Sequence, residues 1–422
     1  MALFVSKEIT MRILQINAVY ATKSTGRSCK ELHDWAVPKG HEVLTVYGNE
    51  PKANVPDTEA IYLGSRIEHK LHALSGRIAG DSGIGSWRAT GKLLGIIRRY
   101  KPDVVHLRNL HGNFVHIPML LRCLAKNDIP TVVQTDDCFW FTGGCMHYTV
   151  NGCYGWQSNC RNCHYLRRGR NYLIANRADV ALRRKMKLFR SIPRLSAIGV
   201  SRWTAEQVGK SIALKKVPII DYVYNWIDLD IFRPQGTEID NATRSKLGLC
   251  NDDIMVLGVA SGWGLNKGLD DFIRLRSILP ANTVIFLVGN MDPSVQLPQG
   301  IIALGATESV TRLAEVYSAA DVFVHLSREE TFGKVTAEAL ACGTPAVVYD
   351  STASPELVSP QTGAAVTPGD LEAVVEEISR LSALRPTEAC RERAKALFSL
   401  NDNCTHQLDI YKKTIELSNT DK

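Results

Sequence analysis

The stretch DVFVHLSREETFGKVTAEALACGTPAVVYD, residues 321–350, contains a complete strand–loop–helix–strand unit. An apolar run opens it, and Gly333 stands where a helix begins. Gly343 and Pro345 stand where that helix ends, because glycine suits the left-handed residue after a helix and proline cannot continue one. A second apolar run, AVVYD, follows at once. This order is the repeating unit of a parallel sheet, so the stretch predicts an α/β domain.

The same alternation recurs in both halves of the chain. In the first half the strand-like runs are MRILQIN (11–17), HEVLTVYG (41–48), DVVHLRN (103–109) and TVVQTDD (131–137). Periodicity fades over the polar residues 233–252, which we interpret as a linker. The alternation then restarts with DIMVLGVASG (253–262) and TVIFLVGN (283–290). We therefore predict two doubly wound parallel-sheet α/β domains.

Composition places the chain among globular proteins. Of its 422 residues, 45% are hydrophobic and 22% charged, and no apolar run reaches the roughly 20 residues that span a bilayer. The leader MALFVSKEIT has too short an apolar patch for a signal peptide, so we expect a cytoplasmic protein. In that compartment the eleven cysteines are expected to be reduced thiols or metal ligands.

Positive charge is concentrated in residues 161–194, which hold eleven Lys or Arg and one acid, Asp179. Apolar residues alternate with these basic residues. Two interpretations stay open: a solvated helical face, or a basic amphipathic segment in peripheral contact with an anionic membrane. We expect no nucleic-acid partner.

Two glutamates flank the predicted helix start in the opening stretch. Glu330 follows the strand, in the crevice where doubly wound sheets bind ligands, and Glu338 lies about two turns into the helix. The helix start at Gly333 offers backbone N–H groups and a positive dipole end, which favour phosphate. A carboxylate beside a phosphate site does not attract the anion, so we expect Glu330 to accept hydrogen bonds from hydroxyl groups such as those of a sugar. The alternative interpretation is that neither glutamate binds a ligand: one of them caps the helix and the other is simply exposed to solvent.

The arrangement S-x-x-E-x-F-G-x-x-x-x-E-A-x-A-x-G-T-P-x-V at 327–347 resembles the E-x7-E motif of retaining glycosyltransferases of family 4. Further motifs follow the order expected of that family: NWID (225–228), NKG (266–268) and LVGN (287–290). The resemblance extends over nearly the whole chain and implies the GT-B architecture, two facing Rossmann-like domains with a cleft between them. It implies an acceptor-binding domain over 1–232, a nucleotide-sugar-binding domain over 233–400, and a C-terminal helix, 401–422, that returns to the first domain.

The resemblance also implies roles for individual residues. Glu330 would contact donor-sugar hydroxyls, Glu338 the ribose, and Lys267 the diphosphate. Backbone donors would come from Gly333, Lys334, Val335 and Thr336, and Gly26 would let a helix of the first domain approach the same phosphates. Lysine and a helix start can replace a divalent ion, so transfer is expected to require no cofactor. The expected donor is a UDP or GDP type of sugar.

Asp136 departs from the family pattern. It stands where the family commonly has the histidine of a His-Asp pair, and Asp137 matches the aspartate. We predict that Asp136 is catalytic, accepting a hydroxyl or stabilising a developing cation, with a strand-end turn as the alternative. A second departure is Gly262, which occupies the place of the arginine that usually stands five residues before Lys267.

The segment 135–166, with its Thr-Gly, aromatics and four cysteines, resembles transferases of colanic acid and related exopolysaccharides. That resemblance implies a lipid-linked saccharide acceptor at the inner face of a bacterial membrane, in exopolysaccharide, capsule or O-antigen (lipopolysaccharide) biosynthesis. The spacing C-x7-C-x6-C-x2-C of Cys145, Cys153, Cys160 and Cys163 predicts a structural zinc site, with disulfides as the alternative. A second hypothesis for the whole chain is a non-catalytic nucleotide-sugar-binding component of a polysaccharide assembly complex.

Overall fold

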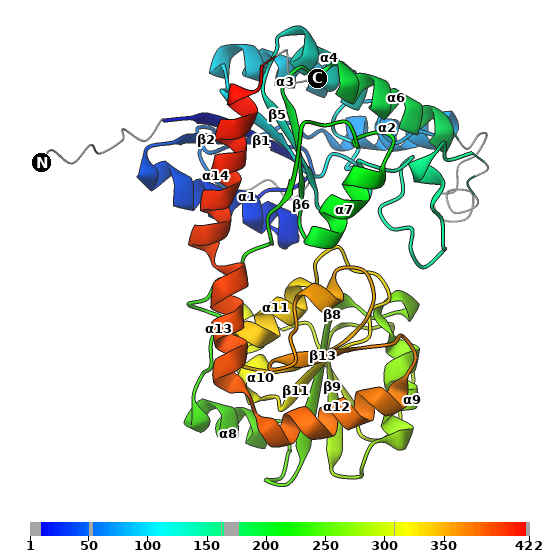
Figure 1. The fold of residues 1–422 in the computed structure, drawn as a ribbon, viewed down its shortest axis with the longest axis vertical. Helices are drawn as coiled ribbons and strands as arrows, with labels where there is room; N and C mark the ends of the chain where they lie inside the picture. The colour runs from blue at the N-terminus through cyan, green and yellow to red at the C-terminus, as the bar shows by residue number, and fades with distance from the viewer. Residues whose placement is uncertain (1–9, 50–53, 162, 164–176, 308, 419–422) are drawn as a thin grey trace, which may run out of the picture. The chain divides into compact units, whose positions relative to one another are not determined.

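The computed structural model describes residues 10–49, 54–161, 163, 177–307 and 309–418, and these form two compact units (Figure 1). The first unit comprises residues 1–223 and 404–422, and the second comprises residues 224–403. The division falls at 223/224, whereas the sequence placed it at 232/233. Within the described residues, no helix is both long and apolar enough to cross a membrane.

The first unit is built on a seven-stranded sheet in which every pairing is parallel, in the order β3-β2-β1-β4-β5-β6-β7. The strands are apolar runs rather than alternating ones because helices cover both faces of a parallel sheet. Their bounds are β1 (Arg12–Asn17), β2 (Glu42–Tyr47), β3 (Ala60–Tyr62), β4 (Val104–Leu107), β5 (Thr131–Thr135), β6 (Leu195–Gly199) and β7 (Ile219–Tyr222).

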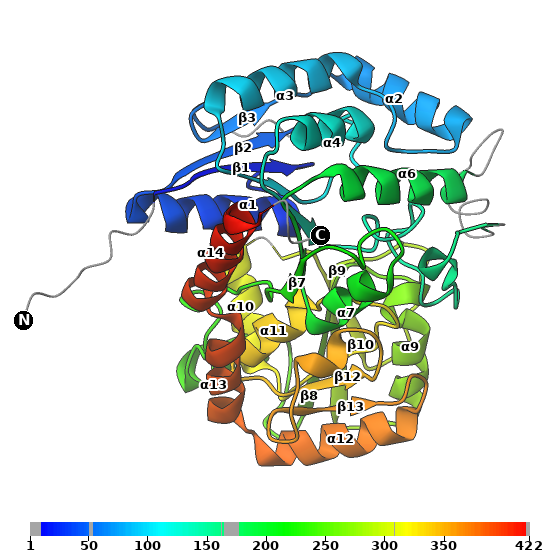
Figure 2. The same cartoon turned by 45° about the horizontal axis from the view of Figure 1, so that its top comes forward.

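Helices form a layer on each side of this sheet. Helix α4 packs against both α3 and α6. Figure 2 shows α3 and α4 on one face of the sheet and α1 on the other. The helices of the first unit are α1 (Lys23–Ala36), α2 (Arg66–Ala79), α3 (Trp87–Tyr100), α4 (Ile117–Lys126), α6 (Ala178–Ser191) and α7 (Arg202–Lys210).

The last helix, α14 (Leu400–Glu416), belongs mostly to the first unit. Its Tyr411 hydroxyl lies 2.7 Å from Nδ1 of His106 on β4, and its Thr414 hydroxyl lies 2.7 Å from the hydroxyl of Ser196 on β6. These four side chains are buried. Helix α14 therefore contributes buried side chains to the core of the first unit.

The second unit has six parallel strands in the order β10-β9-β8-β11-β12-β13. Helix α9 packs beside α12, and α10 packs against both α8 and α11. The strands are β8 (Ile254–Gly262), β9 (Thr283–Asn290), β10 (Ile301–Gly305), β11 (Val322–His325), β12 (Ala346–Tyr349) and β13 (Gly363–Val366). The helices are α8 (Thr237–Lys246), α9 (Leu269–Ile278), α10 (Val310–Ala319), α11 (Lys334–Ala341), α12 (Leu371–Leu384) and α13 (Thr387–Phe398).

The predicted linker over residues 233–252 is wrong. It contains α8, whose Arg244 donates to Asp321 Oδ2 at 2.9 Å and also reaches the carbonyl of Asp253. The helix is polar, with Thr243 its one buried residue, so its apolar periodicity is too weak to reveal it. Its specific contacts to the second unit, rather than an amphipathic face, hold it in place.

The quoted stretch 321–350 folds as predicted, into β11, α11 and β12. Gly333 has φ +94°, and Gly343 has φ +84°. At Gly343 a Cβ atom would lie 2.5 Å from Cγ2 of Thr387, so both backbone conformation and space require glycine there.

Each sheet has one switch point where the order of strands reverses. In the first unit it lies between β1 and β4, and in the second between β8 and β11. Ligands of open parallel sheets bind outside the carboxyl ends of the strands at such points. The loops after these four strands are therefore where we look for function.

Candidate functional site

Two loops meet at the switch point of the second unit. The loop after β8 carries Asn266, and its carbonyl accepts from the Ser327 hydroxyl at 3.2 Å, in the loop after β11. Gly268 has φ +74°, and a Cβ atom there would lie 2.4 Å from the carbonyl oxygen of Leu326. Only glycine lets the two loops approach this closely.

This approach joins the two predicted charged residues. Lys267 Nζ donates to Oε1 of Glu330 in a short contact. The same oxygen lies 3.1 Å from Nε2 of His325, the last residue of β11. The side chains of Lys267 and Glu330 are 32% and 16% exposed. The pair is therefore accessible to a ligand on one side and fixed by His325 on the other.

The surroundings of Glu330 keep it ionised. Burial alone would raise its pKa, but the charge of Lys267 and the hydrogen bond and charge of His325 outweigh burial. The pKa of Glu330 therefore lies well below its usual range. The result is a carboxylate that accepts hydrogen bonds and does not act as an acid near neutral pH.

Helix α11 begins beside this pair, at Gly333. Among the predicted backbone donors, the N–H of Thr336 donates to the carbonyl of Gly333 at 3.0 Å, and its contact to phosphate stays a prediction. The amides of Gly333, Lys334 and Val335 are the other predicted phosphate donors. The Thr336 hydroxyl is buried and has no hydrogen-bond partner among the residues the structure describes.

Glu338 lies further along α11 and is 5% exposed. Its Oε2 accepts from the hydroxyl of Tyr317, on α10, at 3.2 Å. Burial, together with the charge of Glu338, raises the pKa of Tyr317 well above its usual value, so the phenol keeps the proton it donates. The contact to a ribose stays a prediction.

Gly26 lies in helix α1 of the first unit and is buried. A Cβ atom at this position would lie 3.0 Å from Cγ2 of Val19 and 3.2 Å from the carbonyl carbon of Tyr20. Close packing of the helix against its preceding loop thus explains this glycine. Its predicted approach to phosphates stays a prediction.

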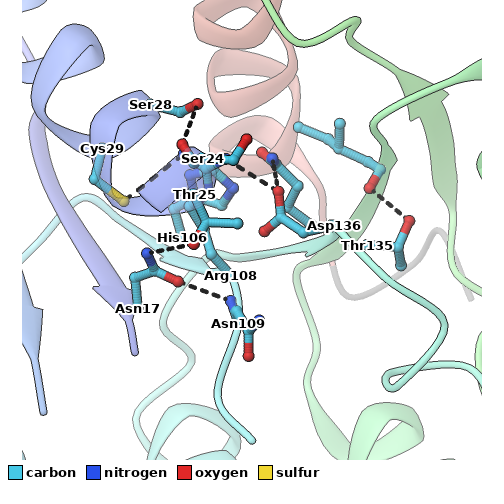
Figure 3. A network of polar contacts seen from close by, with 12 residues as sticks. Asn17, Ser24, Thr25, Ser28, Cys29, His106, Arg108, Asn109, Thr135 and Asp136 are labelled. Atoms are coloured by element: carbon cyan, nitrogen blue, oxygen red, sulfur yellow. Dashed lines mark hydrogen bonds and ion pairs between the residues drawn. The ribbon is translucent and has the colours of Figure 1, made fainter. Parts of the chain in front are cut away.

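Asp136, whose side chain is largely covered, forms an ion pair that the sequence did not reveal. Its Oδ1 accepts from Arg108 Nη2 at 3.1 Å and from Gln134 Nε2 at 2.8 Å. The side chains of Arg108 and Asp136 are 1% and 7% exposed. Figure 3 shows both within a network that ties together the carboxyl ends of β1, β4 and β5, with Asn17 accepting from the N–H of Asn109 at 3.1 Å. The described environment of Asp136 is thus structural, and its predicted catalytic role stays untested.

A histidine–carboxylate pair does exist beside this network: it contains Asp137, which the sequence matched to the aspartate of such a pair, and His111, which sequence reasoning missed. Nε2 of His111 lies 2.7 Å from Oδ2 of Asp137, and the two side chains are 18% and 17% exposed. His111 follows β4 and Asp137 follows β5, which are neighbours in the sheet. Each run was recognisable as a strand in the sequence, but their adjacency in the sheet was not, so no sequence signal paired the two residues.

The four cysteines of the predicted zinc site are near one another, but the structure does not support zinc. The exposed fraction is 5% for Cys145 and 8% for each of Cys160 and Cys163. Across the described part of the chain, no group of three His, Cys, Asp or Glu is arranged to hold a metal ion. A hydrogen bond with Cys163 and burial raise the pKa of Cys145, and burial raises that of Cys160 to about 11.

Within the basic segment 161–194, residues 162 and 164–176 lie outside the described residues. Within α6, Arg184 donates to Asp81 at 2.5 Å and Arg183 to Asp179 at 2.8 Å. Lys185 is buried and donates to the carbonyl of Thr142 at 3.2 Å. Several of these charges thus make internal contacts, and the membrane contact stays a prediction.

Comparison with known proteins bears on the second unit. Residues 253–383 match the family model Glycosyl transferases group 1. This part of the chain is therefore similar to the group 1 glycosyl transferases. It includes every residue of the site built around Lys267, Glu330 and α11.

Curated relatives match part of the chain. The chain is 34% identical over 161 residues to D-inositol 3-phosphate glycosyltransferase of Mycobacteroides abscessus, covering 35% of each protein. It is 30% identical over 203 residues to the enzyme of that name from Mycolicibacterium smegmatis, covering 45% of each. The chain thus spans less than half the length of the curated relatives it matches. The predicted specific resemblance to colanic acid enzymes is not among these findings.

Solved structures match almost the whole chain. Sucrose-phosphate synthase from Thermosynechococcus elongatus superposes with a TM-score of 0.66 at 17% identity, covering 97% of this chain and 100% of that one. Anabaena Alr3699/HepE in complex with UDP and glucose superposes with a TM-score of 0.66 at 16% identity, covering 96% and 100%. With its two parallel-sheet units, the chain therefore has the two-domain, Rossmann-like GT-B fold that the sequence predicted.

Proposed function

We propose that the chain is a retaining, metal-independent glycosyltransferase that moves a sugar from a nucleoside diphosphate to a saccharide acceptor. The observation that carries the proposal is the half-open Lys267–Glu330 pair at the switch point of the sheet whose residues match the group 1 glycosyl transferase model. Both side chains project from loops at the carboxyl ends of adjacent parallel strands, where such sheets bind ligands.

The chemistry of transfer requires what this site offers. As the bond to the anomeric carbon breaks, negative charge grows on the departing diphosphate and positive charge grows on the sugar. Lys267 and the first amides of α11 can stabilise the diphosphate, and each such donor contributes about 3 to 4 kcal/mol in a preorganised site. Glu330 accepts hydrogen bonds from sugar hydroxyls and stays ionised beside the developing cation.

Donor binding requires the Lys267–Glu330 pair to open. A diphosphate would draw Lys267 away from Glu330, since phosphate carries more charge than a carboxylate. His325 would stay 3.1 Å from Glu330 and keep its carboxylate oriented while the sugar hydroxyls replace the lysine. The ion pair thus serves as the resting partner of each group until the donor arrives.

For the acceptor we propose a lipid-linked saccharide in exopolysaccharide, capsule or O-antigen biosynthesis, at the inner face of the membrane. The resemblance of segment 135–166 supports it. A second candidate is an inositol phosphate acceptor, favoured by the names of the curated relatives. A panel containing lipid-linked saccharides and D-inositol 3-phosphate, with labelled UDP- and GDP-sugars as donors, separates the two.

The test of the activity compares Glu330→Gln with Glu377→Gln in the full chain. Glu377 is a matched control because it also pairs with a cation, Arg380, but lies on the exposed face of α12. We expect transfer to fall roughly 100-fold or more in Glu330→Gln and to be unchanged in Glu377→Gln. Undiminished turnover in Glu330→Gln would defeat the assigned role.

Calorimetry with UDP and GDP distinguishes the enzyme from a non-catalytic component that only binds nucleotide sugar. Both hypotheses expect nucleotide binding. Only the enzyme forms a product from labelled donor, so binding without transfer to any acceptor in the panel, and without donor hydrolysis, would favour the binding component.

A further inference from the structure

His111 and Asp137 lie side by side at the carboxyl edge of the first sheet. The loop after β4 carries His111 and the loop after β5 carries Asp137, and Nε2 of the ring lies 2.7 Å from Oδ2 of the carboxylate. The two residues are 26 positions apart in the chain, so the fold and not local sequence brings them together. The edge next to them is the switch point between β1 and β4.

The carboxylate fixes the ring. Oδ1 of Asp137 accepts the N–H of Phe139 at 2.8 Å, which orients the second oxygen, Oδ2, toward His111. A neutral imidazole facing a carboxylate carries its proton on the nitrogen that faces it, which here is Nε2. Nδ1 then has a lone pair and acts as a hydrogen-bond acceptor.

A buried lysine supports the turn behind Asp137. Lys185 donates to the carbonyls of Phe139 and Thr142, the second at 3.2 Å, and its Nζ lies 3.6 Å from the centroid of the Phe139 ring. Only 7% of Lys185 is exposed. Burying an ammonium group is unfavourable unless it is hydrogen-bonded, so moving these two carbonyls away from Lys185 would cost free energy. Lys185 therefore stabilises the turn that positions Asp137.

The ring of His111 remains accessible. Its side chain is 18% exposed, and its hydrogen bond with another side chain, Asp137, uses Nε2. Its other contact is with the ring of Phe139, centroid to centroid 5.4 Å. The adjoining Arg108–Asp136 pair, by contrast, is 1% and 7% exposed. Of the two aspartates after β5, Asp136 thus has a largely covered side chain, and Asp137 pairs with a histidine that is partly exposed.

We propose that His111 is an acceptor-binding residue, whose Nδ1 accepts a hydrogen bond from a hydroxyl of the acceptor sugar, and that Asp137 is its positioning residue. This inference rests on the proposed function. The groups suited to the donor, Lys267, Glu330 and the start of α11, all belong to the second unit, where the family match lies. At its own switch point the first unit offers an oriented imidazole, and a hydrogen-bond acceptor of this kind suits a hydroxyl of the other substrate.

The test measures initial rates for His111→Ala and Asp137→Asn in the full chain. The probe is whichever acceptor of the panel the native protein uses. At saturating donor, we expect KM for the acceptor to rise roughly tenfold or more in His111→Ala, as for loss of one hydrogen bond in a binding site. In Asp137→Asn the ring is still present but less well oriented, so a smaller rise is expected. KM for the donor and the affinity for free nucleotide should not change in either variant.

His33→Ala is the matched control. His33 also lies beside a carboxylate, with Nδ1 3.2 Å from Oδ1 of Asp34, but it is on helix α1 and has no place in the proposed site. All its kinetic constants should equal those of the native protein. His111→Asn tests the chemistry itself, because its amide oxygen can replace the Nδ1 acceptor and should restore part of the lost acceptor affinity.

The possible results separate this inference from the proposed function. An unchanged acceptor KM in His111→Ala, with transfer still measurable, would overturn the inference and leave the transferase intact. A raised donor KM with an unchanged acceptor KM would overturn it too, by assigning the histidine to the donor. Nucleotide binding without transfer by the native protein would overturn both proposals together.

Discussion

The two units each place a cation and a carboxylate at the switch point of a parallel sheet, but they bury the pair to different depths. In the first unit Arg108 and Asp136 are 1% and 7% exposed. In the second unit Lys267 and Glu330 are 32% and 16% exposed. The first pair has the environment of a structural cross-link, and the second has the environment of a site.

This difference teaches that position at a strand end is not enough to identify a functional residue. Asp136 and Glu330 both follow buried strands, and from the sequence both were expected to contact the substrate. What separates them is the partner each one meets. Asp136 pairs with Arg108, a fully covered arginine after the adjacent strand, whereas Glu330 pairs with a partly exposed lysine.

The largest expected effect is on the closed pair. Arg108→Met should destabilise the first unit by about 3 to 5 kcal/mol, because it leaves the Asp136 carboxylate buried without its cation. Hydrogen exchange of the β4 and β5 amides measures this locally. The double variant Arg108→Met, Asp136→Leu should recover most of the loss, since it removes the buried charge as well. A single variant within 1 kcal/mol of the native protein would show that the pair is not a cross-link.

For the partly exposed pair Lys267–Glu330 we expect a large effect on activity and a small effect on stability. Lys267→Met should lower kcat about 10² to 10³-fold, because a charge that stabilises the leaving diphosphate is gone. Its effect on unfolding should stay below about 1 kcal/mol, as for other partly exposed ion pairs. Steady-state kinetics and a urea titration of one preparation measure both. If the variant unfolds easily but turns over normally, the contrast between the two pairs does not hold.

Tyr317→Phe tests a buried hydrogen bond between these extremes. The change deprives the buried Glu338 carboxylate of one donor, which costs about 1 to 3 kcal/mol in stability of the second unit. If Glu338 also contacts the ribose as predicted, KM for the donor should rise while kcat changes little. Tyr154→Phe, at an exposed tyrosine of the first unit, is the control. An unchanged donor KM would remove the support for the ribose contact.

The smallest effect is a dependence on pH. Because Glu330 has a lowered pKa in the folded chain, it stabilises the second unit fully above the ordinary pKa of a glutamate, about 4.3, and progressively less as the pH falls below it. The difference in unfolding free energy between native protein and Glu330→Gln should therefore be constant from pH 7 to 5 and shrink below pH 4. Its size should be a few tenths to about 1 kcal/mol, since the pair is partly exposed. A difference that grows in acid would contradict the assigned partners.

The sequence revealed those parts of the fold that follow from local pattern. Apolar runs and the glycines at 333 and 343 predicted β11, α11 and β12, because those positions need a left-handed backbone that few residues adopt. Helix α8 was missed because polar contacts such as Arg244 to Asp321 hold it, and such contacts leave no periodic trace.

The candidate site was predictable where its residues share one motif and not where they meet only in space. Glu330, Gly333 and Glu338 lie within nine positions, so one short motif was enough to predict all three. His325 was passed over as a strand residue, although it contacts Glu330. Arg108 and His111 were missed because their partners, Asp136 and Asp137, come from a different strand, and strand order cannot be read from one sequence.

Helix α14 has a practical consequence. The polypeptide leaves the first unit after residue 223 and rejoins it at residue 404, so two separate segments make up one folding unit. A fragment ending at residue 223 would expose the face of β4 and β6 that Tyr411 and Thr414 normally cover. Anyone wishing to produce that unit alone must graft the last segment back onto it, for example by joining residue 223 to residue 404 through a flexible linker.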